Sequence, residues 1–348
     1  MGTCQICHKT ESVISNQFGV CQKCIKQMPE QALKITDRIH EKSRAQFDLP
    51  AKPPKHKNGI SCGVCANDCK IGLAQKGYCG LVENVNGQLV RHGGTSRNGI
   101  LEWYYDPLPT NCVAWWFCPG CTGAGYPEYS YKQGAETGYV NLAVFYGSCS
   151  YDCLFCQNWH YRRLAQKHQP SMSAEKLAEK VDERVACVCF FGGDPSTQMP
   201  HALKASQMAV EKAEKKKRIL RICWETNGNM KRKFAKKVAE FSLQTGGVVK
   251  FDLKTWNENL HKALCGISNK SALQNFQMIG EEYFPQRLEL PVLAASTLLI
   301  PGYVDVEEVE NIAGFIAEIN PKIPYTLLAF YPNYVMDDLP TTSRKQAY

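Results

Sequence analysis

The sequence predicts an α/β protein, a partial (β/α)6 TIM-like barrel with a small N-terminal cysteine-rich metal-binding region. Two observations support this prediction. From residue 141 onward short apolar runs alternate with amphipathic stretches, and before residue 122 the chain carries repeated C-x2-C pairs. Strands that are apolar along their whole length and alternate with helices are typical of a parallel sheet covered by helices. An open doubly wound sheet is the alternative.

Six apolar runs mark the expected strands: 142–146, 186–191, 219–224, 248–253, a segment within 288–300, and 325–330. Between them, apolar residues recur at helical spacing. These helical stripes are Leu177, Val181 and Val185; Met230, Phe234, Val238 and Phe241; and Val309, Ile312 and Ile316. A further polar stretch, about 29–47, has helical character.

A proline-rich segment, 49–55, breaks any helix and indicates a linker. We therefore expect a knuckle, helix and linker over 1–55, a cysteine- and aromatic-rich region over 56–135, and the barrel over 136–348. Residues 340–343 resemble a helix start, yet the chain stops at residue 348. A sixth strand without its covering helix exposes apolar residues such as Leu327, so we expect a truncated C-terminus.

Composition favours a globular protein, with 44% hydrophobic and 21% charged residues. No apolar run reaches the roughly 18 residues of a membrane span, and the N-terminus does not resemble a signal peptide, so we expect a cytoplasmic protein without a membrane partner. The net charge of +8 comes largely from Lys212–Arg218 and Lys231–Lys237. Solvated helix faces explain these clusters; a nucleic-acid surface is the alternative, but no aromatic residues are interleaved.

The 18 cysteines indicate metal binding, because disulfides are not expected in a reducing compartment. Cys4, Cys7, Cys21 and Cys24 have the spacing of a closed zinc site, with rubredoxin-like iron as the alternative. Cys62, Cys65, Cys69 and Cys79 form a second potential tetrad, to which Cys112, Cys118 and Cys121 could add ligands. It is either an auxiliary cluster that passes electrons or a structural zinc site. Cys187, Cys189 and Cys223 lie in strand runs, where buried structural thiols are expected.

A third cysteine group, Cys149-x3-Cys153-x2-Cys156, follows the first expected strand. In barrels of this kind the chemistry lies at the carboxyl ends of the strands. Three thiolates can hold three irons of a [4Fe–4S] cluster and leave the fourth iron open to a chelating ligand. A zinc knuckle with His160 as fourth ligand is the alternative.

Several motifs, in consistent order over roughly residues 140–340, carry a family resemblance. They are Cys156-Gln157-Asn158-Trp159, Gly192-Gly193-Asp194-Pro195, Glu225-Thr226-Asn227-Gly228, Asp252-Leu253-Lys254 and Ile300-Pro301-Gly302. Together with Phe155 before the third cysteine, they resemble the radical S-adenosylmethionine (SAM) superfamily. The closer resemblance is to the branch related to pyruvate formate-lyase activating enzyme, in a subgroup with an N-terminal cysteine-rich region.

The resemblance implies a role for each matching residue. Cys149, Cys153 and Cys156 would ligate the [4Fe–4S] cluster, with Phe155 beside it. Gly192, Gly193 and Asp194 would receive the methionine amino group. Thr226 and Asn227 would lie near the ribose or methionine part, Lys254 would pair with the carboxylate, and Ile300 would lie near the adenine.

The resemblance also implies an oxidoreductase reaction. The reduced cluster cleaves SAM to methionine and a 5′-deoxyadenosyl radical, which abstracts hydrogen from the substrate. The substrate would be a glycine of a partner glycyl-radical enzyme, and the electron donor a flavodoxin or ferredoxin. The sequence differs from many activases: no ferredoxin-like cysteines follow the radical motif, and residues 328–332 lack a histidine. A small molecule or RNA as substrate is the alternative. A non-catalytic zinc-binding protein is the alternative from another class.

Overall fold

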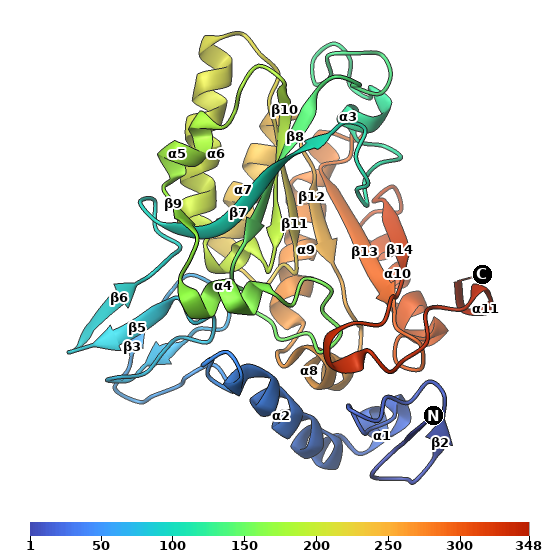
Figure 1. Ribbon diagram of the computed structural model, residues 1–348. Helices are drawn as coiled ribbons and strands as arrows, with labels where there is room; N and C mark the ends of the chain where they lie inside the picture. The colour runs from blue at the N-terminus through green and yellow to red at the C-terminus, as the bar shows by residue number, and fades with distance from the viewer. Residues whose placement is uncertain (348) are drawn as a thin grey trace.

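An eight-stranded curved sheet lies at the centre of the computed structural model, which describes residues 1–347 (Figure 1). The strand order is β14-β13-β12-β11-β10-β8-β7-β9. Strands β8 and β10 to β14 are parallel, whereas β7 pairs antiparallel with β8 and β9. The strands are β7 (Gly99–Pro107), β8 (Val140–Tyr146), β9 (Ser171–Met172), β10 (Val185–Gly192), β11 (Arg221–Thr226), β12 (Val249–Asp252), β13 (Leu293–Leu299) and β14 (Tyr325–Ala329).

The six parallel strands confirm the predicted α/β partial barrel. They follow one another across the sheet in chain order, without the reversal of strand order that defines a doubly wound sheet. The alternative of an open doubly wound sheet is therefore wrong. The sequence did not indicate β7, which extends the barrel at its edge.

Helices cover the outer face of the sheet (Figure 1). Leu142, Val144 and Tyr146 of β8 point outward into the main hydrophobic core, as their partners on β10 do. Ser173 caps the first of these helices, because its side chain accepts a hydrogen bond from the Lys176 amide. The covering helices are α5 (Ala174–Glu179), α6 (Met199–Lys215), α7 (Arg232–Thr245), α9 (Lys270–Glu282) and α10 (Val306–Ile319).

One predicted helical stripe is shorter than expected. Helix α5 ends at Glu179, so Val181 lies beyond it and Val185 opens β10. The Asp182 carboxylate accepts a hydrogen bond from the Arg184 amide at 2.9 Å. Such a local turn competes with helical hydrogen bonding and ends the helix. Similarly, Met230 precedes α7, although it is buried in the same core.

The N-terminal region packs against the carboxyl ends of the parallel strands, below the sheet in Figure 1. Its helices contact α8, which follows β12. The predicted helix over 29–47 is confirmed as α2. The elements of this region and its contact are β1 (Gly2–Thr3), β2 (Thr10–Glu11), α1 (Gln22–Gln27), α2 (Pro29–Ala45) and α8 (Glu258–Cys265).

Short elements fill the remaining connections. Between α2 and β7 lie β3 (Ile60–Ser61), β4 (Lys70–Ile71), β5 (Val82–Val85) and β6 (Gln88–Arg91); elsewhere are α3 (Pro119–Thr122), α4 (Tyr161–Lys167), α11 (Arg344–Ala347) and the 3-10 helices η1 (Pro195–Thr197), η2 (Phe284–Gln286) and η3 (Tyr334–Met336). Leu327 of β14 is 42% exposed. In the described chain, no helix has the length and apolarity needed to cross a bilayer.

Candidate active site

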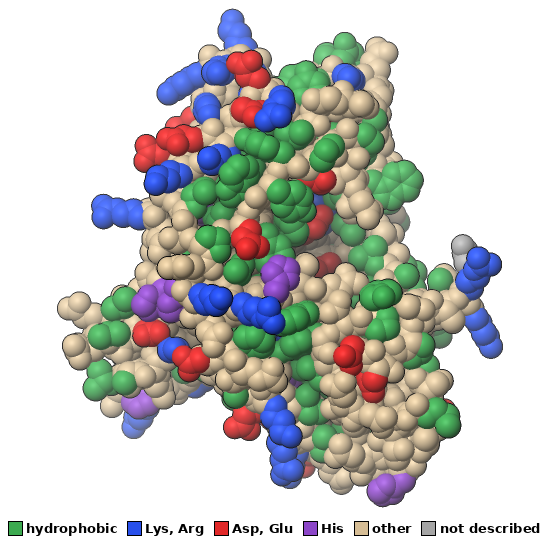
Figure 2. Space-filling model, in the orientation of Figure 1, with side chains coloured by type: hydrophobic (Ala, Val, Ile, Leu, Met, Phe, Trp, Pro, Cys, Tyr) green, Lys and Arg blue, Asp and Glu red, His purple; other side chains and the backbone are tan. Residues whose placement is uncertain are grey.

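A cavity of about 180 Å³ opens among the carboxyl ends of the parallel strands. Figure 2 shows the middle of this face of the molecule hollowed between hydrophobic side chains. Residues from β10 to β14 and from the loop after β8 meet here, as expected for a barrel of parallel strands. The cavity is lined by Cys149, Tyr151, Cys153, Phe155, Cys156, Gln157, Asn158, Tyr161, Phe191, Gly192, Gly193, Asp194, Glu225, Asn227, Asp252, Lys254, Ser296, Leu298 and Leu328.

Three thiols, those of Cys149, Cys153 and Cys156, occupy one end of this cavity. Burial raises the pKa of Cys149 and raises that of Cys156 to about 11. The Asn227 amide nitrogen donates a hydrogen bond to the Cys149 sulfur at 3.5 Å, which favours a negative sulfur. Thiols that do not ionise by themselves give up their protons when they bind a metal.

The three sulfur atoms do not suit a single small ion. Within residues 1–347, they are not among the groups whose ligand atoms all lie within 4.8 Å of one another. No histidine lines the cavity, and His160 instead stacks on Phe145 with ring centroids 4.6 Å apart. The zinc-knuckle alternative therefore lacks its fourth ligand, whereas a larger inorganic cluster fits three more widely spaced thiolates.

A buried ionic network holds the cysteine loop in place. The Asp152 carboxylate lies 2.6 Å from Arg162 and 2.9 Å from His40 of α2, and Arg44 lies 3.5 Å away. Burial acts to raise the pKa of Asp152, but the charges of Arg162 and Arg44 and the hydrogen bond with His40 outweigh it and hold the pKa well below its usual value. The loop between the first two cysteines is thus tied to both α4 and the N-terminal region.

Gly192 and Gly193 bring the backbone close to the cavity at the end of β10. A Cβ atom on Gly193 would lie 2.2 Å from the Ser148 carbonyl oxygen, and Gly192 has a φ of +109°. Only glycine allows this close approach and this conformation. A ligand of the cavity can therefore reach backbone groups that any other residue would cover.

The Asp194 carboxylate is held by donors from two neighbouring segments. It accepts hydrogen bonds from the Ser196 backbone amide at 2.7 Å, the Asn227 backbone amide at 2.6 Å and the Thr226 hydroxyl at 3.1 Å. Burial raises the pKa of Asp194 to about 6, although these hydrogen bonds act in the opposite direction. Thr226 itself does not line the cavity; its hydroxyl contacts the lining residue Asp194.

Lys254 and Ile300 differ in their relation to the cavity. The Lys254 ammonium lies 2.7 Å from the Asp252 carboxylate and lines the cavity. Burial acts to lower the pKa of Lys254, but Asp252 and Cys153 outweigh it, so the pKa lies above its usual value and the group stays charged. Ile300 is fully buried beside Tyr303 and does not line the cavity; Leu298 and Leu328 supply the apolar wall instead.

Sequence reasoning missed several lining residues, including Asp252 and Ser296. The Ser296 hydroxyl donates to Asp252 at 2.8 Å, and the two residues are register partners on β12 and β13. Asp252 is a polar residue between the apolar residues Phe251 and Leu253, which is a detectable signal, whereas Ser296 is followed by the polar residue Thr297. Tyr151 could not have been found in this way, yet its buried hydroxyl has no partner among the described residues. Such an unsatisfied group fits a cavity that binds a polar ligand.

The N-terminal tetrad, Cys4, Cys7, Cys21 and Cys24, is compact. Its four sulfur atoms all lie within 4.8 Å of one another, and the Cys7 and Cys21 sulfurs are 3.8 Å apart. A tetrahedral zinc ion with Zn–S bonds near 2.3 Å holds its sulfurs about 3.8 Å apart. The spacing therefore fits a single ion, and the cysteine cluster could bind zinc or iron.

The second tetrad packs beside the cysteine loop of the cavity. Cys65 and Cys69 are buried, and Arg91 donates to the Cys62 sulfur at 3.5 Å. The Asn67 side chain donates to the Ser150 carbonyl at 2.7 Å. Among residues 1–347, these four thiols do not form a single-ion group like the first tetrad.

The loop cysteines Cys112 and Cys118 do not join the second tetrad. They line a different cavity, deeper in the barrel. Cys121, beside Cys118, lies on the same loop and bonds to the Thr110 carbonyl. The expectation that they add ligands to the second tetrad is therefore wrong, because β7 carries this loop to the amino-terminal side of the sheet.

Comparison with known proteins adds a family match. The model of the family described as "Radical SAM superfamily" matches residues 143–316. The chain is 23% identical over 291 residues to the uncharacterized protein MJ0808 of Methanocaldococcus jannaschii, which covers 82% of this chain and 74% of that protein.

Two more distant similarities cover smaller shares. The isethionate sulfite-lyase activating enzyme of Desulfovibrio desulfuricans is 39% identical over 84 residues, which are 24% of this chain and 25% of that enzyme. The structure of Streptococcus suis SuiB bound to precursor peptide SuiA aligns with 51% of this chain and 36% of its own, at 16% identity and a TM-score of 0.38. The chain thus spans about a quarter to a third of these two proteins.

Proposed function

The chain belongs to the radical SAM superfamily, and from this premise we propose that its cavity at the strand ends cleaves SAM reductively to start hydrogen abstraction from a substrate. The family implies a [4Fe–4S] cluster, SAM and an electron donor. The observation that carries the proposal is that three thiols, the exposed backbone at Gly192 and Gly193, and the buried ammonium of Lys254 all line one cavity.

The proposed roles follow from the positions of the side chains. Cys149, Cys153 and Cys156 would hold the cluster, which supplies one electron to SAM and so releases methionine and a 5′-deoxyadenosyl radical. The backbone at Gly193 would receive the methionine amine, and Lys254 would pair with its carboxylate. The barrel wall would exclude water from the reacting atoms.

Other residues that line the cavity would orient the ribose and adenine parts of SAM. Asn227 lies between Cys149 and Asp194, so its side chain can contact both the cluster and the cofactor. Phe155 lines the cavity and would pack beside the cluster, and Leu298 is the better candidate for an adenine contact because Ile300 does not line the cavity. Asp194 and Thr226 would position Asn227 without themselves reacting.

The direct test uses anaerobically purified protein mixed with dithionite and SAM. We expect iron, acid-labile sulfide and the formation of 5′-deoxyadenosine. A preparation that holds no iron, or that yields no 5′-deoxyadenosine when its iron content is full, would contradict the proposal.

A Gly193→Ala substitution tests the role of the Gly193 backbone separately. The new Cβ would overlap the Ser148 carbonyl, and overpacking of this kind costs about 1–3 kcal/mol. We expect SAM affinity, measured anaerobically by calorimetry, to fall by about tenfold or more. In the control Gly314→Ala, the Cβ meets nothing within 4 Å, and affinity should stay unchanged. Equal SAM affinities in the Gly193→Ala and Gly314→Ala variants would show that the backbone at Gly193 does not contact SAM.

Glycyl-radical activation is the finer function that we propose for this reaction. It is supported by the similarity of 84 residues to an activating enzyme and by the order of the motifs. A flavodoxin or ferredoxin would supply the electron. A glycyl-radical EPR doublet on mixing with a candidate partner enzyme is the expected result; radical products from a small molecule or RNA alone would favour those substrates instead.

The N-terminal tetrad would bind zinc, given its compact spacing. Cys24→Ser should release the metal and increase the rate of proteolysis within residues 1–28 by about tenfold, because a segment this small depends on its ion for folding. Metal analysis and limited proteolysis check this, with the exposed neighbour Lys23→Ser as control. Full metal retention in Cys24→Ser would contradict the assignment, and iron in place of zinc would identify a rubredoxin-like site.

The second tetrad would bind an auxiliary iron–sulfur cluster. Its four sulfur atoms do not all lie within 4.8 Å of one another, as binding of a single ion would require. The Asn67 side chain of this segment donates a hydrogen bond to the Ser150 carbonyl in the loop of the catalytic cysteines. The position beside that loop suits a group that passes electrons to it.

A further inference from the structure

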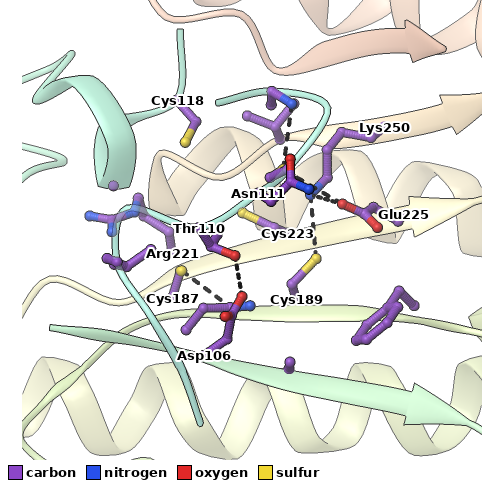
Figure 3. A pocket seen from close by; sticks show the side chains of 18 of the residues that line it. Asp106, Thr110, Asn111, Cys118, Cys187, Cys189, Arg221, Cys223, Glu225 and Lys250 are labelled. Carbon is purple, nitrogen blue, oxygen red and sulfur yellow. Dashed lines mark hydrogen bonds and ion pairs between the residues drawn. The ribbon is translucent and has the colours of Figure 1, made fainter. Parts of the chain in front are cut away.

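A second cavity, of about 110 Å³, lies in the bore of the barrel (Figure 3). Phe191 and Glu225 line both this cavity and the candidate active site, so the two are neighbours. The loop that follows β7 closes the interior of the barrel at the amino-terminal ends of the parallel strands, opposite the candidate active site. Five of the lining residues are cysteines: Cys112, Cys118, Cys187, Cys189 and Cys223.

Strand geometry explains why three of these thiols face inward. Side chains alternate between the two faces of a strand, so Cys187 and Cys189 point into the bore while Val188 and Phe190 point to the helices. Cys189 and Cys223 are register partners on the adjacent strands β10 and β11. These thiols are therefore placed around one space and not dispersed through the core.

A buried cation lies among the thiols. The Lys250 ammonium contacts the Cys112 sulfur at 3.1 Å and the Cys189 sulfur at 3.4 Å, and it pairs with Glu225 at 2.8 Å. Its side chain is only 4% exposed. The Glu225 carboxylate already balances the Lys250 charge, and the ammonium can in addition donate hydrogen bonds to ionised sulfurs of Cys112 and Cys189.

The thiols divide into two sets by their hydrogen bonds. Cys187 donates to the Asn141 side chain at 3.4 Å, and Cys121 donates to the Thr110 carbonyl at 3.6 Å. Cys112 donates to the Glu225 carboxylate at 3.6 Å. Among the described residues, Cys118, Cys189 and Cys223 donate no hydrogen bond to an oxygen atom. Figure 3 shows the Cys189 sulfur next to the Lys250 ammonium, with the sulfurs of Cys118, Cys187 and Cys223 around the same cavity.

We propose that Cys112 and Cys118 of the loop, together with Cys189 and Cys223 of the sheet, bind a further iron–sulfur cluster in the bore of the barrel. Thiolates are the usual ligands of such clusters. Each ligating thiol gives up its proton on binding, and Lys250 compensates part of the charge. Within residues 1–347, no three of these sulfurs all lie within 4.8 Å of one another, and the same is true of the sulfurs of Cys149, Cys153 and Cys156. A cluster accommodates this wider spacing, whereas zinc does not.

The test compares two double variants of the full chain, purified anaerobically. Cys112→Ser with Cys223→Ser removes two proposed ligands, and Cys121→Ser with Cys187→Ser is the matched control. Both are made in the wild-type chain and in a Cys149→Ala, Cys153→Ala, Cys156→Ala background. We expect the first pair to lower iron and acid-labile sulfide by one cluster in both backgrounds, and the control pair to leave them unchanged.

Unchanged iron and sulfide in the first pair, or loss of zinc in place of iron, would overturn the proposal. Circular dichroism melting reports whether each variant folds. If the first pair does not fold, Cys118→Ser against Cys121→Ser gives the same comparison within one turn of the loop. The triple-alanine background lacks the ligands of the catalytic cluster, so iron that the first pair loses in this background cannot come from that cluster. Failure of the bore-cluster proposal is therefore distinguishable from failure of the proposed SAM cleavage.

Discussion

Replacing Cys153 with alanine is expected to abolish 5′-deoxyadenosine formation. Cys153 is the middle thiol of the three that line the cavity, and it is 9% exposed. Removing groups that only support a metal ligand typically costs about 10–100-fold, so loss of a ligand itself should exceed about 100-fold. Product is measured by chromatography after anaerobic incubation with dithionite and SAM, and normalised to protein.

Cys265 provides the matched control for this substitution. It is fully buried near Cys153 but does not line the cavity. Cys265→Ala should keep its iron and its product. If Cys265→Ala loses iron as fully as Cys153→Ala, or if Cys153→Ala retains activity, the ligand assignment is wrong.

Replacing Asp152 with alanine is expected to cause the largest loss of stability. The substitution leaves Arg162, whose side chain has no exposed surface, without its carboxylate partner. Breaking a buried pair in this way typically costs about 3–5 kcal/mol in the free energy of unfolding. Anaerobic urea titration, on metal-free protein as well as on loaded protein, separates this loss from loss of a cluster.

Asp37 is the control for Asp152. It also forms an ion pair, with Lys52 at 2.5 Å, but the side chains of Lys52 and Asp37 are 68% and 43% exposed. Asp37→Ala should change the free energy of unfolding by about 0–1 kcal/mol. Where Asp152→Ala does not fold, Asp152→Asn keeps the volume and tests the charge. Equal urea midpoints for the Asp37 and Asp152 variants would show that the network does not hold the loop.

Much of the barrel is predictable from local sequence. The run 142–146 lies within β8, and the run 325–330 contains β14, because strands buried on both faces are apolar throughout. The motifs after these strands are predictable too, since the carboxyl ends of parallel strands meet at one edge. Gly192, Gly193 and Lys254 do line one cavity.

What sequence could not supply depends on contacts between distant segments. Strand β7 is an edge strand whose pairing with β8 no local pattern specifies. The sequence predicts Cys189 and Cys223 as thiols within strands, and the structure places both there. A short apolar run does not indicate that the two residues are register partners facing one cavity. The partners of Asp152 are equally remote: His40 precedes it by 112 residues.

The distance between His40 and Asp152 along the chain has a thermodynamic consequence. Asp152 lies between two cysteines of the candidate cluster site, while His40 and Arg44 belong to the N-terminal helix α2. Whatever orders the cysteine loop must therefore strengthen the docking of α2, and by reciprocity docking of α2 must raise the loop's affinity for its occupant. Binding at the cysteine loop and docking of α2 are therefore linked through the ion pairs of Asp152.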